Sequence, residues 1–476
     1  MKAKGCVMKG VWAVGWLVLG GAVGLGGMGY ATVLSPDGYL KQVANAHLGY
    51  QAAQATQESL QGIRLEATSP YQPRLMGGAS LQFSRNYGPM AQFTGPDTTM
   101  QSFQLGLEGE WNNGVGYGVG YGIQYFGYSG SSFGIKPYYQ ASPYAQLVWP
   151  LWHNNGGKRT AQQTASLKAQ HDAMHWQSMA QITRVLSGAE TVYWRLSMAQ
   201  EALSLAEDGV GRAKKMLQWV RQRQQRGLAD ATDVAQTQAL LKARELDVSV
   251  AQTEVQQLGR DFNNARGLSP THPIESIQRL SEGIRTLPSP TVTTASSELR
   301  ATLAVSEAEL ARMQATILSG DPLLNLTGRV QLNPVQSGFG DMLTHSLSTD
   351  YSTVTVALQY ASGLDLQTVL AIQAGYEKAK EANRLLRDQA LKDRQHAMTQ
   401  YTMALQAAKD RLQDTTELES LMQTKWQLET QRHANGRSTL AQVLTAEQEY
   451  KQATLQRLRV KADIVLTTIQ LQQLGR

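Results

Sequence analysis

Few residue patterns in this 476-residue chain are suited to catalysis or to metal binding. His171 and His175 are four residues apart, so both imidazoles would lie on one face of a helix, but no glutamate follows His171 and no third ligand is evident. The run GYGVGYG at 116–122 lacks the strand-to-helix context of a dinucleotide-binding loop. No convincing nucleophile elbow, P-loop or Cys/His cluster is present. We therefore predict a protein that is not an enzyme and that holds no metal and no cofactor.

The first 31 residues have the pattern of a secretion signal. Three lysines within the first ten residues precede a long uncharged run with small residues before Ala31. We expect a signal peptide at 1–31, cleaved after Ala31; the alternative is an uncleaved membrane anchor. The only cysteine, Cys6, lies in this segment. Removal of the three lysines lowers the net charge from +6 to +3, so charge gives little reason to expect nucleic acid as a partner.

Long gaps between prolines indicate long helices. No proline occurs between Pro150 and Pro270 or after Pro334, and both stretches are rich in strong helix formers. Within them, apolar and small residues recur every seven positions, which is typical of helices packed side by side. Arg244 and Arg457 also fall in this seam. The expected helices are 36–68, 159–226, 228–266, 293–319, 366–435 and 437–474.

The chain contains an internal repeat. Gly227 and Gly436 are 209 residues apart, and RGLADATDV around the first returns in degenerate form as NGRSTLAQV around the second. Each copy reads helix, strand, loop, strand, long helix, glycine turn, helix. The expected units are a first repeat at 32–267, a Pro/Ser-rich connector at 268–292 and a second repeat at 293–476. The expected strands are 76–88, 142–151, 323–333 and 351–361.

Strand number and helix length constrain the assembly. The strands have about ten residues each, the length of a tilted membrane-spanning β-strand. At about 1.5 Å per residue, the helical columns would be roughly 100 Å long. Four strands cannot close a barrel, and an open sheet edge finds no hydrogen-bond partner in lipid. Copies of the chain must therefore combine; three copies would give twelve strands, although the sequence does not itself fix that number.

This order of elements resembles the TolC-type outer-membrane efflux proteins, the outer membrane factors. The resemblance covers essentially all of the chain after the signal and rests on the duplicated order rather than on one motif. It implies a fold that is mainly α with a membrane β-barrel. Each protomer would supply part of a long antiparallel α-helical barrel plus four β-strands, and a homotrimer would form a 12-stranded barrel. The connector 268–292 would lie in an equatorial region.

The same resemblance implies location and partners. The protein would be a passive exit duct in the bacterial outer membrane, extending into the periplasm and gated at its periplasmic tip. It would serve a tripartite efflux pump or a type I secretion system. Its implied partners are a periplasmic membrane-fusion adaptor, an inner-membrane transporter of the RND, ABC or MFS type, and outer-membrane lipid.

The two glycine turns are the candidate functional site. A glycine that ends a helix adopts positive φ without steric cost, and the next helix then needs a cap. Asp230 and Thr439 are placed as these caps, and Asp233 and Gln442 follow three residues later, as in a capping box. The resemblance implies that the adaptor docks at the turns. The docking candidates are Gly227, Leu228, Gly436 and Arg437.

The gate of this chain is expected to differ from that of its relatives. Well-known members of the family have carboxylates that ring the closed entrance on the helix after the second turn, where this chain has the neutral Gln442 and Thr445. Asp233 matches an acidic position in the first repeat, and His433 could face it across the tip. Such a contact would make the gate pH-sensitive, since histidine titrates near a pKa of about 6.5. The alternative is a capping or solvated role for these residues.

Residues 89–141 are an insertion in the first repeat. Period-two alternation within 100–128, around the turn signal NNG at 112–114, predicts a β-hairpin. This hairpin either extends above the barrel as an external lid or inserts as an extra strand pair. We expect the extracellular extension, because the family's barrel uses four strands per protomer.

Two further alternatives remain open at the level of sequence. A secreted or surface coiled-coil scaffold or adhesin without transport activity would explain the heptads, but not the duplicated strand pairs. The segment 211–227 has six basic residues and no acid. It is either a recognition surface for an acidic adaptor or a solvated helix face.

Overall fold

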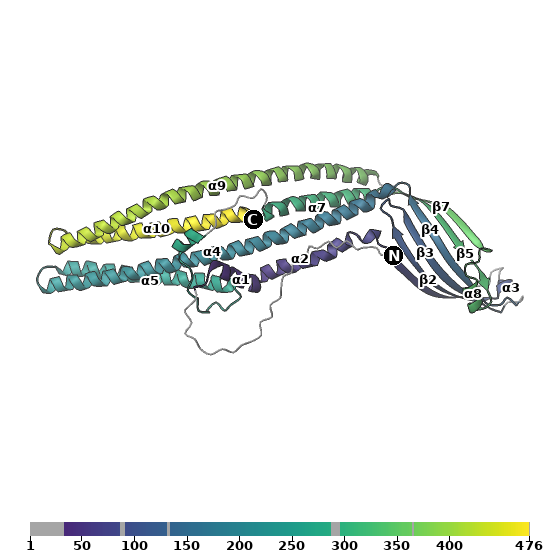
Figure 1. Cartoon of the computed structure of the whole chain (residues 1–476), viewed down its shortest axis with the longest axis horizontal. Coiled ribbons are helices and arrows are strands. Elements are labelled where there is room, and N and C mark those ends of the chain that lie inside the picture. Colours follow the sequence, from purple (N-terminus) through teal and green to yellow (C-terminus); the bar gives the residue numbers. More distant parts are fainter. Residues whose placement is uncertain (1–32, 86–90, 131–133, 287–295, 364–365, 476) are drawn as a thin grey trace, which may run out of the picture.

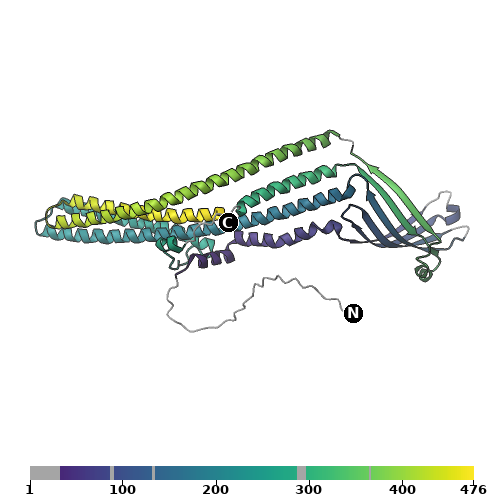
Figure 2. The ribbon, with the colours of Figure 1, turned by 45° about the horizontal axis from the view of Figure 1, so that its top comes forward.

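The computed structural model describes residues 33–85, 91–130, 134–286, 296–363 and 366–475. The chain forms a long, narrow bundle of helices with a β-sheet at one end and two helical turns at the other (Figures 1 and 2). The structure is mainly α with a small antiparallel sheet, which confirms the predicted class of long helices combined with antiparallel strands. The expected signal peptide at 1–31 lies outside the described residues.

Two long helices, α4 (Lys158–Gln225) and α9 (Leu366–Ala434), run from the sheet to the turns. Each is paired with shorter helices that follow one another along its length. Those beside α4 are α1 (Pro36–Ala46), α2 (Leu48–Glu66) and α5 (Ala231–Ala265). Those beside α9 are α7 (Ser297–Ser319) and α10 (Leu440–Gly475). Helix α7 lies between α9 and α4 and packs more extensively on α4. The remaining α-helices of the described chain are short: α3 (Ala91–Thr94), α6 (Leu280–Thr286) and α8 (Phe339–Thr344).

The helix expected at 36–68 is divided at His47. The backbone of His47 is extended (φ −74°, ψ 116°), and its Nδ1 accepts a hydrogen bond from the Gly49 N–H at 3.1 Å, which caps α2. At the other end of α1, Ser35 accepts from the Gly38 N–H at 3.2 Å. The break therefore separates two independently capped helices.

A belt of aromatic side chains forms the core midway along the bundle. Tyr39 stacks on Phe262 with ring centroids 4.2 Å apart, and both side chains are fully buried. Tyr193 donates a hydrogen bond to the Leu34 carbonyl at 2.6 Å, and burial raises its pKa to about 12. The connector that contains α6 packs here on α4 and α10, with Leu280 fully buried. The belt thus joins α1, the middle of α4, the end of α5 and the connector.

The sheet has six long antiparallel strands in the order β1-β2-β3-β4-β5-β7, and a short β6 (Val335–Gln336) pairs with β4. Four of them lie where strands were expected: β1 (Arg74–Arg85), β4 (Tyr138–Pro150), β5 (Leu323–Leu332) and β7 (Ser352–Ala361). The other two are β2 (Asp97–Glu110) and β3 (Gly116–Ser129), which form the predicted hairpin.

The expectation of an extracellular hairpin, and with it the count of four strands per chain, is wrong. Strands β2 and β3 lie between β1 and β4 in the sheet, and their turn at 111–115 points toward the helices, not away from them. Alternation of apolar and polar residues is the same in a lid and in a wall strand. The pairing of β2 with β1 and of β3 with β4 in the folded sheet decides between the two.

Candidate functional site

The first helical turn closes with a glycine in the left-handed region. Gly227 has φ +74°, its N–H donates to the Gln224 carbonyl, and the N–H of Leu228 donates to the Arg223 carbonyl, both at 2.9 Å. This pair of bonds is a Schellman motif. Asp230 and Asp233 then form a reciprocal capping box at the start of α5, with the Asp233 carboxylate accepting from the Asp230 N–H at 3.2 Å.

The second turn repeats this geometry with different side chains. Gly436 has φ +74°, and the N–H groups of Gly436 and Arg437 donate to the carbonyls of His433 and Arg432 at 3.0 and 2.8 Å. Here the capping box uses neutral partners. The Gln442 N–H donates to the Thr439 hydroxyl at 3.3 Å, and Gln442 Oε1 accepts from the Thr439 N–H at 3.0 Å.

One carboxylate supports the second turn from the preceding helix. Ser438 Oγ donates to Glu429 Oε2 at 2.5 Å, and Arg432 donates to the same carboxylate group at 3.0 Å. The hydrogen bond from Ser438, together with nearby positive charge, lowers the pKa of Glu429. The charged form of Glu429 is therefore the one that this turn favours.

The residues proposed for docking and gating have different surroundings. Gly227, Leu228, Gly436 and Arg437 are all exposed at the extreme end of the bundle. Within the chain, the described contacts of Asp233 and His433 do not join these two residues. Asp233 caps α5, while His433 Nδ1 lies 2.6 Å from the Ser438 carbonyl and the His433 ring packs edge-on against Trp219. Gln442 acts in the capping box, and exposed Thr445 donates to the Ala441 carbonyl at 3.0 Å.

Arg223 joins the two turns to each other. It stacks on Trp219 at 4.9 Å, and its guanidinium donates to the His433 carbonyl at 3.3 Å and to the Leu228 carbonyl at 3.5 Å. One side chain of the first helical hairpin thus contacts both turns. Of the six basic residues of 211–227, Arg223 and Arg212 have partners inside the bundle, whereas the four others are exposed.

A buried charge network behind the turns was missed at the level of sequence. Arg244 on α5 forms an ion pair with Glu447 on α10, and both side chains are at most 5% exposed. Arg212 on α4 reaches the same carboxylate group at 3.4 Å. Asp247 on α5 pairs with Arg244 at 3.2 Å and also with Lys451 on α10. The network joins the two repeats, and its signal in the sequence was a charged residue, Arg244, at a seam position.

The sheet has one apolar and one polar face. The register aligns odd-numbered residues of β1 to β4 with even-numbered residues of β5 and β7, so their side chains form one continuous surface. Exposed members of this apolar face are Leu75, Leu81, Phe103, Leu107, Val119, Leu147, Leu326, Val330, Val354, Val356 and Leu358. The opposite face has Ser, Thr, Gln, Asn, Glu and Arg side chains, among them Gln104, Gln146, Thr327, Arg329 and Thr355. Aromatic residues mark both ends of the apolar face, with Tyr117, Trp149 and Tyr360 near the helices and Phe83, Tyr125 and Tyr139 at the far end.

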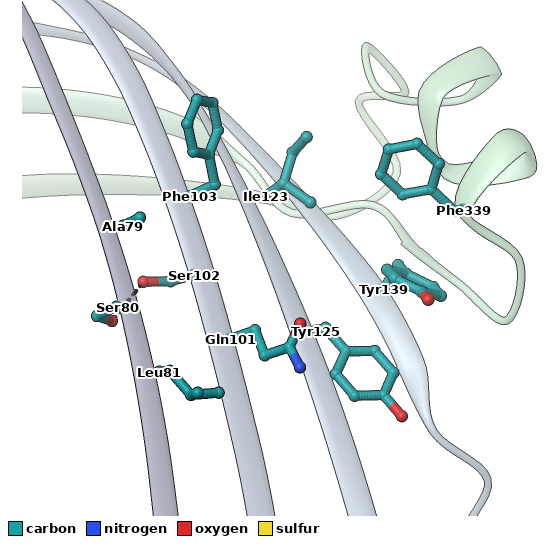
Figure 3. A pocket seen from close by; sticks show the side chains of 10 residues that line it. All are labelled: Ala79, Ser80, Leu81, Gln101, Ser102, Phe103, Ile123, Tyr125, Tyr139 and Phe339. Carbon is teal, nitrogen blue, oxygen red and sulfur yellow. Dashed lines mark hydrogen bonds between the residues drawn. The ribbon is translucent and has the colours of Figure 1, made fainter.

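The loop between β5 and β7 folds back onto the far part of the apolar face. Phe339 of α8 lies edge-on against Tyr139, with ring centroids 5.6 Å apart, and lines a hollow with Phe103, Ile123 and Tyr125 (Figure 3). Met342 of the same helix is fully buried. Helix α8 thus covers part of the apolar surface at the end of the sheet far from the helices.

Two kinds of feature are absent from the described part of the chain. None of its helices combines the length and apolarity that a membrane crossing requires. Among its His, Cys, Asp and Glu side chains, no three lie close enough together to hold a metal ion. His171 lies 3.0 Å from its neighbour Asp172, and His175 packs against Trp176.

Comparison with known proteins defines the class. The structure is similar to the outer-membrane channel OprN (16% identity, TM-score 0.63, covering 93% of this chain and 90% of that one). It is also similar to the outer membrane protein VceC of Vibrio cholerae (14%, 0.65, 92% and 96%) and to the open state of the MtrE outer membrane channel of Neisseria gonorrhoeae (13%, 0.60, 92% and 88%). A search of curated protein sequences gives no significant match. The fold is that of outer-membrane channels.

The family follows from the sequence itself. A family model described as outer membrane efflux protein matches residues 39–258. Residues 39–258 therefore belong to the outer membrane efflux protein family. The protein is located in the outer membrane and acts as an exit duct in efflux or secretion, as a conduit rather than an enzyme.

Proposed function

We propose that three copies of the chain form a channel that spans the outer membrane and the periplasm and serves as the exit duct of a tripartite efflux pump or a type I secretion system. The observation that supports this most directly is the sheet. One of its faces is apolar across all six strands, while the other is polar. Such a sheet fits a wall between lipid and water.

The edges of the sheet favour association with further copies. Within the described strands, β1 and β7 each have one neighbour, so each leaves an edge of unpaired backbone groups. These groups have no partner in lipid. Because the sheet has an even number of long strands, β1 and β7 run in opposite directions. The β1 edge of one copy can therefore pair antiparallel with the β7 edge of the next, and a ring of copies closes without free edges.

The helical turns are the proposed docking and gating end. Gly227, Leu228, Gly436 and Arg437 are exposed together at the end farthest from the sheet, where a periplasmic adaptor would reach them first. We place the gate at the same end, with Asp233, His433, Gln442 and Thr445 as the side chains nearest to it. An inner-membrane transporter of the RND, ABC or MFS type would supply the energy, since the proposed channel itself is passive.

A cross-linking experiment tests the ring of copies. After replacement of Cys6, one cysteine is introduced on the polar face of β1 (Ser80→Cys) and one on the polar face of β7 (Thr355→Cys), with neighbouring positions on each strand covering the unknown register. A short bismaleimide should produce covalent dimers and trimers from outer membranes. In a matched control, the second cysteine is moved from β7 to Gln146→Cys on β4, in the centre of the sheet. This variant should give no covalent dimers or trimers.

The scaffold or adhesin alternative has a different outcome in this experiment. A protein without a membrane wall would be recovered in the soluble or secreted fraction, and its β1 and β7 cysteines would not cross-link between copies. That result would overturn the proposed channel. Trimers that also show conductance in planar bilayers would support it.

A further inference from the structure

We propose that strands β2 and β3 are part of the channel wall, so that the closed trimer has an eighteen-stranded barrel and an outer-membrane pore wider than the twelve-stranded one that the family resemblance implies. This inference rests on the proposed trimeric channel.

The strand ladders integrate the hairpin fully into the sheet. Residue pairs join β1 to β2 at twelve positions, β2 to β3 at fourteen and β3 to β4 at eleven. An external lid would leave β1 paired directly with β4, but here the whole hairpin separates them. The added pair also preserves the direction of every other strand, since two antiparallel strands return the chain to the end where it started.

The faces of the added strands match those of the sheet. On one side Phe103, Leu107 and Val119 are 44–52% exposed and lie in register with Ala79, Leu75 and Ala145 of the neighbouring strands. On the other side the hairpin presents Gln104, Glu108 and glycines. A hairpin in water on both sides would have no need for an apolar face of this extent. A wall strand in contact with lipid requires one.

The turn of the hairpin is locked into the junction between β4 and α4. Gly114 (φ +82°) and Gly157 (φ +74°) allow two backbone segments to come very close together. A Cβ on Gly114 would lie 2.3 Å from the Asn154 carbonyl oxygen, and a Cβ on Gly157 would lie 2.2 Å from the Asn112 carbonyl oxygen. Glu110 Oε1 accepts hydrogen bonds from Asn154 Nδ2 at 2.9 Å and Thr160 Oγ1 at 2.5 Å. These contacts hold the hairpin at the base of the sheet, where an external lid could not reach.

The inner face of the added strands is shaped to keep the lumen clear. Tyr144 of β4 lies close over two glycines of the adjacent strands. A Cβ on Gly120 would come within 2.6 Å of the Tyr144 ring, and a Cβ on Gly106 within 2.9 Å of the Tyr144 hydroxyl, so only glycine leaves room for this ring. Gln104 donates to the Tyr144 hydroxyl at 3.1 Å, and the Arg329 guanidinium stacks on the same ring at 4.2 Å. Glycines covered by a flat aromatic ring pin the strands together without side chains that project into the pore.

The expected size follows from the strand number. With strands about 4.8 Å apart and tilted by about 40°, eighteen strands enclose a barrel about 36 Å across at the backbone, and twelve strands one of about 24 Å. The ratio of about 1.5 is independent of the tilt if both barrels share it.

A distance measurement across the barrel tests the inference. In a background without Cys6, a spin label on Thr355→Cys places one label per chain on the polar face of β7, and pulsed EPR measures the separation within the trimer. The full chain should give about 30 Å, and a variant that lacks residues 97–129 should give about 20 Å, because three equivalent positions are separated by about 0.87 of the diameter. β1 and β4 are antiparallel and can pair directly in the deletion variant.

The outcomes separate this inference from the proposed channel. Trimers with equal separations in the two variants would overturn the inference and leave the channel intact. Chains that remain monomeric, with no dipolar coupling in either variant, would overturn both.

A second measurement, made on the full chain, tests the inference even if the deletion variant fails to fold. Spin labels on Leu107→Cys and Glu108→Cys of the full chain should differ in accessibility, with the first reached by oxygen from the lipid and the second by a water-soluble nickel reagent. Equal access of the nickel reagent to both positions would show a hairpin in water and overturn the inference.

Discussion

The two repeats of the chain are nearly identical at one end and unlike at the other. Their long helices have 68 and 69 residues, their returning helices have 35 and 36, and both turns are Schellman motifs around a glycine at φ +74°. At the sheet end the first repeat supplies four long strands and the second only two. The helical half is therefore fixed in length, whereas the sheet half can change by a whole hairpin. An added hairpin preserves strand direction, but a longer helix would displace its turn from the common end.

The side chains around the matching turns have also diverged. The first capping box uses two aspartates and the second uses Thr439 and Gln442. Glu429, which supports the second turn, corresponds to the buried Val220 in the first repeat. The backbone of the turn is thus common to both repeats, and the charge at the turn is particular to each.

The buried charge network that joins the two repeats has no equivalent at the corresponding positions 209 residues away, and breaking it should cause the largest loss of stability. Arg244 and Glu447 correspond, 209 residues away, to the uncharged Ala453 and Gln238. Arg244→Met leaves the buried Glu447 with only the longer contact to Arg212, and should lower the free energy of unfolding by about 3–5 kcal/mol, since an uncompensated buried charge is costly. Urea unfolding at fixed protein concentration measures the change.

Two matched variants show whether the effect comes from burial of charge. Lys242→Ala removes an exposed ion pair with Glu245 on the same helix and should change stability by less than about 1 kcal/mol. The double variant Arg244→Met with Glu447→Met removes both charges and should recover most of the loss. If Arg244→Met behaved like Lys242→Ala, the network would contribute nothing to the joint.

The sequence predicted the elements well, but not their neighbours. Proline gaps, heptads and the glycines at 227 and 436 are local signals, and the expected helix and strand limits lie within a few residues of those observed, apart from the break at His47. The placement of the 100–128 hairpin depended on which strands flank it, and this is a property of the assembled sheet. Arg244 stood out at a seam position, but its pairing with Glu447 could not be predicted, because 203 residues separate the two partners. The roles of the tip residues stay predictions.

The common backbone of the turns gives the next prediction. Gly227→Ala and Gly436→Ala should each destabilise their own turn by about 1–2 kcal/mol, because a Cβ is unfavourable at positive φ. A Cβ meets no atom within 4 Å at either position, so the cost is conformational and should be equal in the two turns. Hydrogen exchange of the Leu228 and Arg437 amides should then accelerate roughly 5- to 30-fold.

An asparagine serves as the control for the turns. Asn enters the left-handed region more readily than Ala, so Gly227→Asn and Gly436→Asn should exchange more slowly than the alanine variants. Clearly different rates for the two alanine variants would contradict the equivalence of the turns.

The smallest expected effect is the pH response of the second turn. The pKa of Glu429 is lowered in the folded protein by the hydrogen bond from Ser438, so its stabilising contribution is present above the ordinary glutamate pKa of about 4.3 and is lost as the pH falls through the lower folded value. Exchange at Arg437, corrected for the intrinsic pH dependence of amide exchange, should therefore accelerate modestly below about pH 4. Glu429→Gln keeps the shape of the side chain without its charge, and should remove this pH dependence while leaving exchange at Leu228 unchanged. Because Val220 occupies the corresponding position of the first turn, Glu429 cannot act through a feature common to both. A pH response that persisted in Glu429→Gln would assign it to another group at the tip.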